Sequence, residues 1–249
     1  MTSASLLVNA PGFSDAVTRL PEAPDLSVGL HFNLTVGSPV AARKDVATLV
    51  DSRTGAFYPL PRFVRRTLAG LVRPEEVAVE CTAQLERVRA AGITVTHIDS
   101  HQHVHVLPRV WGPVLARARQ ARIGAIRVPI EPYGSRAFRT GAAIKQLCIR
   151  SAWRVAAAAD AGDDVRVAHF RGMMIQGTPH FLSCLLALLD RLPEGVTELM
   201  VHPGYADDDR AGWDRQPAQR EVELVALCSP SLAARLSRGD ITLGPLGVR

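Results

Sequence analysis

Four of the eight histidines of this 249-residue chain lie between positions 97 and 105, in the segment THIDSHQHVH. Side chains of an extended chain alternate with a period of two, so His97, Asp99, His101, His103 and His105 are predicted to face the same side. Imidazole and carboxylate groups together suit zinc, magnesium-like and other first-row divalent ions. A single histidine here would more often be a hydrogen-bonded core residue. Packing rarely needs so many histidines, so we interpret the cluster as a metal centre.

Three further segments that carry polar groups are predicted at the carboxyl ends of strands, where chemistry collects in parallel α/β folds. They are GLHFNLT (29–35), IRVP (126–129) and MVHPGY (200–205). His31 alone would be weak evidence, because a histidine in an apolar strand is usually structural. His202 precedes Pro-Gly, a sharp turn that would hold its imidazole at the mouth of a barrel. Arg127 is read equally well as a substrate-binding arginine or as a salt-bridged arginine at a strand end.

Short apolar strands alternate with amphipathic helices along the whole chain, which predicts an α/β fold with a mostly parallel sheet. We expect an incomplete or distorted TIM-like (β/α) barrel and a single domain over residues 1–249. A loop rich in Gly, Pro and charge is expected at 37–61. Strands are predicted at 4–8, 26–34, 93–98, 125–129, 165–170, 198–201 and, weakly, 241–243; helices are predicted at 13–20, 74–91, 109–122, 141–159, 182–189 and 219–228.

The composition argues against several other classes of protein. Hydrophobic residues make up 47% of the chain, enough for a sizeable core, but no apolar run is long enough to span a bilayer. The start has no basic region typical of a signal peptide, so a cytoplasmic location is expected. The net charge of +5 comes from arginines scattered along helices, as in the trio Arg62, Arg65 and Arg66, and aromatics are only 5%. We therefore read them as solvated helix faces and expect no nucleic-acid partner.

The strand-end segments together resemble the YdjC family of carbohydrate deacetylases, the family of chitooligosaccharide deacetylase. The motifs that carry the resemblance are GLHFNLT, THIDSHQHVH and MVHPGY, and the similarity extends to TSASLLVN at positions 2–9. HFRG at 169–172 and YADDD at 205–209 also look like the branch of the family associated with hopanoid lipid biosynthesis.

This resemblance implies an incomplete (β/α) barrel that hydrolyses the N-acetyl group of an amino sugar and releases acetate. His31 and His101 match the two histidine metal ligands of the family, with Mg²⁺ or Zn²⁺ as the ion. His202 would protonate the leaving amine, and Arg127 would hold a sugar hydroxyl or a phosphate. Asp99 and His103 would not bind the metal themselves but would support the histidines that do. The partner is then an amino-sugar or glycolipid substrate, with no stable insertion into a membrane and a homodimer as an option.

The chain departs from the family pattern at its start. The family begins with a strand ending in Asn-Ala-Asp-Asp-Phe-Gly, whose aspartates supply the third ligand and the catalytic base. Met1 falls where the family enters its second strand, so one β-α unit of about thirty residues is expected to be absent. An internal methionine mistaken for the start is the favoured explanation, and a truncated, inactive chain is the other.

Three functions stay open on these grounds. The first is a metal-dependent deacetylase of chito-oligosaccharides or of an N-acetylglucosaminyl lipid. The second is a barrel that binds a carbohydrate or glycolipid without turning it over, because the aspartate segment is absent. The third is another metal-dependent hydrolase or isomerase that shares the strand-end histidines.

Overall fold

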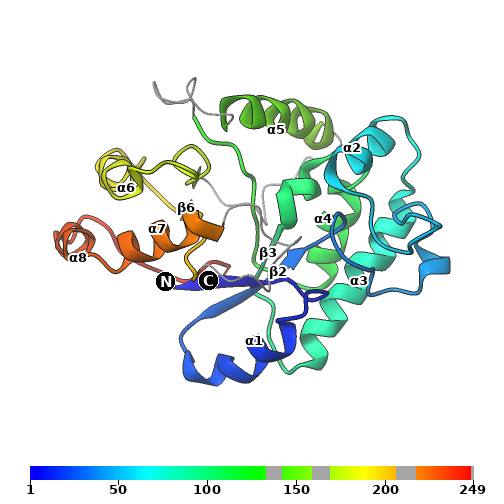
Figure 1. Ribbon diagram of the computed structural model, residues 1–249, viewed down its shortest axis with the longest axis horizontal. Coiled ribbons are helices and arrows are strands. Elements are labelled where there is room, and N and C mark those ends of the chain that lie inside the picture. The colour runs from blue at the N-terminus through cyan, green and yellow to red at the C-terminus, as the bar shows by residue number, and fades with distance from the viewer. Residues whose placement is uncertain (133–141, 159–168, 206–216, 248–249) are drawn as a thin grey trace. The chain divides into compact units, whose positions relative to one another are not determined.

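The computed structural model describes residues 1–132, 142–158, 169–205 and 217–247 (Figure 1). These residues form an α/β fold in which every strand pairing is parallel, as predicted. They group into two compact units, one mainly Met1–Val128 and the other mainly Val167–Gly244. The described residues do not test the prediction of a single domain, and closure into a barrel also stays a prediction. None of the described helices is long and apolar enough to cross a membrane.

The first unit is built on a sheet of four parallel strands in the order β1-β2-β3-β4. Parallel neighbours need crossover connections, and helices supply them here. Apolar residues of α3 and α4 pack with those of β2 and β3 in one buried cluster. The strands are β1 (Ser3–Leu6), β2 (Ser27–Phe32), β3 (His97–Ser100) and β4 (Ala125–Ile126), and the helices are α1 (Phe13–Arg19), η1 (Leu20–Glu22), η2 (Arg43–Asp45), α2 (Leu60–Leu68), α3 (Pro74–Ala90), η3 (His101–Val106) and α4 (Trp111–Gln120).

The second unit contains a separate two-stranded parallel sheet, β5 (His169–Arg171) and β6 (Thr197–Leu199). Its helices are α6 (Phe181–Leu189), α7 (Pro217–Leu227) and α8 (Pro230–Leu236), which share a buried apolar cluster that includes Phe181, Leu185 and Leu232. Helix α5 (Ala142–Ala157) has residues in both units. The predicted strand at 165–170 lies partly outside the described residues, and its described end is β5.

Among the described residues, the predictions missed the α-helices α2 and α8, and one predicted strand is wrong. Helix α2 does carry an apolar row, because Leu60, Phe63, Val64 and Leu68 fall at i, i+3, i+4 and i+8, and the prediction overlooked it. Helix α8 does carry a start signal, because Ser229 accepts a hydrogen bond from the Leu232 N–H and Pro230 takes the first turn. Residues 241–243 form no strand.

Gly29 in β2 faces the ring of His97 at the start of β3. A Cβ at position 29 would lie 2.4 Å from ring atoms of His97. That ring cannot move aside easily, because its Nε2 lies 3.1 Å from the Ser5 hydroxyl and its Nδ1 lies 2.9 Å from the Thr96 hydroxyl. The contact explains why a residue without a side chain stands before Leu-His31 in the motif.

Replacing Gly29 by alanine is therefore expected to lower the free energy of unfolding by about 1–3 kcal/mol, since the added methyl overpacks a rigid site. Urea unfolding followed by circular dichroism measures the loss. Gly12→Ala is the matched control, because nothing lies within 4 Å of a Cβ at position 12. An equal loss in both variants would contradict the His97 contact as the cause.

Candidate active site

The parallel register of β2 and β3 places two predicted site residues side by side. His31 pairs with Asp99 and Phe32 with Ser100. Because both strands end at the same edge of the sheet, the side chains at their carboxyl ends converge. The His31 Nδ1 lies 2.8 Å from the Asp99 Oδ1. The structure thus joins two motifs that are separated by 68 residues in the sequence.

Asp99 is a buried carboxylate with cationic or donor groups on both oxygens. Its Oδ2 lies 2.7 Å from the Arg127 Nη1, on the residue that follows β4. Burial raises the pKa of Asp99, but Arg127 and His31 more than offset this effect and bring the pKa well below its ordinary value. An ionised Asp99 accepts the Nδ1–H of His31, which leaves the lone pair of the His31 Nε2 available to a ligand.

His101 begins the turn that follows β3 and lies next to His31. The centroids of the two imidazole rings are 5.6 Å apart with an angle of 77° between the rings. Two imidazole rings at this separation suit two positions around one divalent ion. Within the described ranges, no group of three or more His, Cys, Asp and Glu side chains could hold a metal ion. The two imidazoles alone would therefore not complete the coordination sphere of a metal ion, and the roles of His31 and His101 as ligands stay predictions.

The predicted common face of His97, Asp99, His101, His103 and His105 is wrong. The chain is extended only as far as Ser100 and then enters the short helix η3. Within η3, Gln102 and His103 both have a φ of 58°, in the left-handed region. The period-two alternation stops where this turn begins, so the histidines beyond it point in different directions.

His97 and His105 have structural partners instead. The Nε2 of His105 lies 2.7 Å from the Arg127 backbone oxygen, and its Nδ1 contacts the Ser100 hydroxyl. These contacts tie the turn after β3 to the end of β4. Burial lowers the pKa of His97 and of His105 to about 4, so both imidazoles are neutral at pH 7. His103 is buried, and its role in supporting a ligand stays a prediction.

Arg127 is buried with 8% of its surface exposed. Its ion pair with Asp99 corresponds to the salt-bridged arginine that the sequence left open as an alternative. Binding of substrate by Arg127 stays a prediction. The ion pair links Arg127 to His31 indirectly, because the charge of Arg127 keeps Asp99 ionised and Asp99 in turn holds His31.

His202 lies in the second unit, just after β6. Its backbone N–H donates to the Glu223 Oε2 of α7 at 2.5 Å, and its Nδ1 lies 3.4 Å from the Gln176 Nε2. Burial raises the pKa of Glu223, an effect that the hydrogen bond from His202 reduces in part. The role of His202 as the acid stays a prediction. Of the YADDD motif, only Tyr205 is described, and residues 206–209 lie outside the described ranges.

Two polar residues of α3 that the sequence analysis did not single out hold the long loop that follows β2. Glu80 of α3 accepts hydrogen bonds from the backbone N–H groups of Val40 and Ala41, at 2.9 and 3.0 Å. Gln84 binds both the Asn33 backbone oxygen and Glu80 at 2.7 Å. The spacing of Glu76, Glu80 and Gln84 was the available signal, because a polar row at i, i+4 and i+8 lies beside the apolar stripe of α3.

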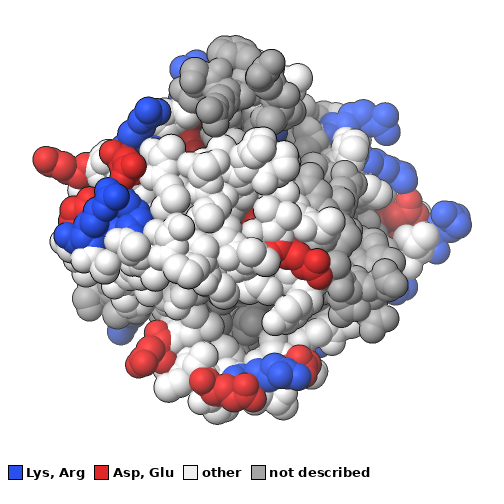
Figure 2. All heavy atoms as spheres, turned by 60° about the vertical axis from the view of Figure 1, so that its left-hand side comes forward, with Lys and Arg blue, Asp and Glu red and all other residues white. Residues whose placement is uncertain are grey.

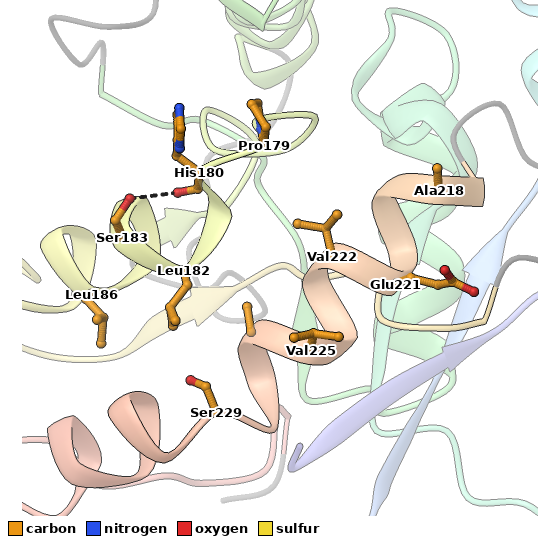
Figure 3. A pocket seen from close by; sticks show the side chains of 11 residues that line it. Pro179, His180, Leu182, Ser183, Leu186, Ala218, Glu221, Val222, Val225 and Ser229 are labelled. Carbon is orange, nitrogen blue, oxygen red and sulfur yellow. Dashed lines mark hydrogen bonds between the residues drawn. The ribbon is translucent and has the colours of Figure 1, made fainter.

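The second unit carries a groove between α6 and α7 (Figure 3). Leu182, Leu186, Val222 and Val225 line it, and the Ser183 hydroxyl at its edge donates to the His180 backbone oxygen. Figure 2 brings this side forward and shows a broad area of uncharged side chains with acidic and basic groups around it. None of the predicted site residues lines the groove, so the groove is not part of the candidate site at the strand ends.

Comparison with known proteins accounts for these motifs. The family model described as YdjC-like protein matches residues 1–238. The chain belongs to the YdjC-like family. This YdjC-like chain is 33% identical over 246 residues to a protein of Geobacillus stearothermophilus named carbohydrate deacetylase, covering 98% of the chain and 84% of the relative. It is 35% identical over 234 residues to a Brevibacillus brevis protein of the same name, with 93% and 82% covered.

A solved structure supports the same fold. An Enterococcus faecalis V583 protein named as a cellobiose-phosphate cleavage protein matches this YdjC-like chain with a TM-score of 0.75 and 26% sequence identity. The match covers 98% of this chain and 86% of that protein. The predicted family and the α/β class are confirmed.

Proposed function

We propose that this protein is a carbohydrate deacetylase, an amide hydrolase that removes the N-acetyl group of an amino sugar. The observation that carries the proposal is the Asp99-held imidazole of His31 beside His101, at the joined ends of β2 and β3. It occurs in a chain about one third identical to proteins named carbohydrate deacetylase. A site of this kind, on the carboxyl edge of a parallel sheet, is where substrates bind in such folds.

His31 and His101 would hold the metal, Mg²⁺ or Zn²⁺, as two of its ligands. A divalent ion bound there lowers the pKa of water and polarises an amide carbonyl. Asp99 fixes the tautomer of His31, and Arg127 keeps Asp99 ionised. In our proposal the oxygen of water adds to the acetyl carbon, and His202 gives a proton to the amide nitrogen as the bond between that nitrogen and the acetyl carbon breaks. His202 regains its proton from the water that was consumed, and the acetic acid formed ionises at neutral pH, so the products are the free amine and acetate.

The substrate class in this proposal is an N-acetylated amino sugar, either a chito-oligosaccharide or the headgroup of an N-acetylglucosaminyl lipid. Asn33, which follows β2 and therefore lies next to the site, contributes to the anchoring of the loop. Its side chain accepts from the N–H groups of Thr35 and Val36 and donates to Asn9. A loop held this firmly suits selection of a sugar by shape rather than by reordering on binding.

Acetate release from di-N-acetylchitobiose tests the proposal directly. We expect release that a chelator abolishes and that added Mg²⁺ or Zn²⁺ restores. His31→Ala and His101→Ala should each lower kcat/KM at least about 100-fold, because each removes a ligand. The matched control is His180→Ala, an exposed histidine outside the site. Full activity in the presence of chelator, or in either ligand variant, would refute the metal-dependent mechanism.

A binding protein without turnover is the second candidate. The observation that favours it is the set of only two candidate ligands that the described residues bring together. It predicts that calorimetry detects binding of the sugar while no acetate forms with either metal. Tight, stoichiometric metal binding together with acetate release would exclude it.

A further inference from the structure

The turn between α2 and α3 carries an apolar tip, residues 68–71, that is exposed to solvent. Leu68 and Leu71 lie three positions apart, and 69% and 53% of their surfaces are exposed. Ala69 and Gly70 between them are exposed as well. A single exposed leucine is common, but four consecutive exposed residues without a charged or polar side chain form a continuous apolar surface.

This tip is held rigidly. The N–H of Leu71 donates to the Arg66 backbone oxygen at 2.9 Å, and the N–H of Gly70 donates to that of Thr67 at 3.1 Å. Gly70 has a φ of 73°, the left-handed conformation that ends a helix in this way. The next residue, Val72, is fully buried and its carbonyl accepts from the Arg109 Nε at 2.8 Å. The leucines are therefore displayed by a fixed backbone, and exposing them does not require the chain to unfold.

Basic side chains flank the tip in the sequence. Between positions 61 and 74 the chain has four arginines and no acidic residue: Arg62, Arg65, Arg66 and Arg73. The guanidinium groups of Arg62 and Arg66 lie 4.4 and 4.6 Å from the centre of the Tyr58 ring. Arg62 also pairs with Asp51, and the Arg73 side chain is 72% exposed and only 3.8 Å from Glu76.

We propose that this turn docks the protein on the surface of an anionic phospholipid bilayer. Leu68 and Leu71 would enter the boundary between headgroups and acyl chains, while Arg65 and Arg73 contact lipid phosphates. Charge complementarity selects the partner, since exposed Arg65 and Arg73 flank the aliphatic tip in the sequence and match a negatively charged, apolar-cored surface. Nucleic acid is a poorer match, because the tip offers no aromatic side chain for bases to stack on. The proposal is independent of the catalytic assignment.

Sedimentation of the full chain with lipid vesicles tests it. We expect binding to vesicles that contain about one third phosphatidylglycerol, no binding to pure phosphatidylcholine, and release at high salt. The double variant Leu68→Ser, Leu71→Ser should bind about tenfold more weakly, as should Arg65→Gln combined with Arg73→Gln. Leu243→Ser is the control, because Leu243 is 61% exposed in the other unit.

The outcomes separate cleanly, since these substitutions are at exposed positions away from the strand-end histidines. Unfolding in urea and acetate release from a water-soluble sugar should be unchanged in the leucine variant, so weaker sedimentation reports docking alone. Absence of binding to anionic vesicles would overturn the proposal, as would equal binding of the leucine variant and the wild type. Retention on polyglutamate without vesicle binding would assign the surface to an acidic protein and would also overturn it.

Discussion

Replacing Asp99 by asparagine is expected to lower kcat/KM for acetate release by between about 10-fold and 100-fold. Asp99 now accepts from His31 on one oxygen and binds Arg127 on the other. An asparagine has one oxygen, which the Arg127 guanidinium would take, so its NH₂ group would face the His31 Nδ1. That nitrogen must then accept a hydrogen bond, which places the ring proton on Nε2. The lone pair that would bind a metal is lost, although the side chain keeps its size.

A measurement other than activity, the protonation of the His31 ring, distinguishes this positioning role from a loss of folding. The ¹⁵N chemical shifts of the His31 ring report which nitrogen carries the proton, and they should exchange between Nδ1 and Nε2 in Asp99→Asn. Metal affinity measured by calorimetry should fall in parallel with activity. Asp15→Asn serves as the control, because Asp15 forms an exposed helix-surface pair with Arg19. An unchanged tautomer together with wild-type activity would show that Asp99 does not position His31.

The pairing of His31 with Asp99 was predictable in outline, because the alternation of strands and helices implies a parallel sheet whose carboxyl ends converge. The register that makes them neighbours was not predictable, since nothing local to either strand specifies which residues pair. The directions of the side chains in the histidine cluster were harder still to predict. Its periodicity assumed an extended chain, whereas two consecutive residues, Gln102 and His103, adopt left-handed conformations that few non-glycine residues favour.

The difference between a candidate ligand and a structural histidine also depended on tertiary contacts. His97 is held by Ser5, which is 92 positions away, and His105 by a backbone oxygen 22 positions away. Both are histidines, and each lies four positions from His101, so neither residue type nor spacing distinguished them from it. The buried glutamate Glu80 shows the reverse case, since its partners are backbone groups of a loop whose path the sequence did not predict.

Acidification from pH 7 to pH 4.5 is expected to cost the protein several kcal/mol of stability through His97 and His105. Burial lowers the pKa of each to about 4, against about 6.5 in the unfolded chain. Below pH 6.5 the unfolded state binds protons that the folded state does not, so the free energy of unfolding falls as pH falls. The full shift corresponds to about 3 kcal/mol for each histidine, a large part of the about 5–15 kcal/mol typical of a folded protein.

Other buried groups act in the opposite direction and must be separated from this effect. Burial raises the pKa values of Glu80, Glu131 and Glu223, so their contribution to stability increases on acidification. A matched variant isolates the histidine contribution, because His97→Gln removes one titrating group and leaves every carboxylate in place.

Urea unfolding midpoints from pH 7.5 to pH 4.5 provide the measurement. The pH dependence of stability should be shallower in His97→Gln than in the wild type, by up to about 3 kcal/mol over this range. This holds even though the variant is less stable at pH 7.5, where Ser5 and Thr96 lose their partner. In His180→Gln, which changes an exposed histidine, the pH dependence should match the wild type. Parallel curves for His97→Gln and the wild type would mean that His97 is protonated as readily in the folded chain as in the unfolded one, and its ring would then not be the neutral, buried group that packs against Gly29.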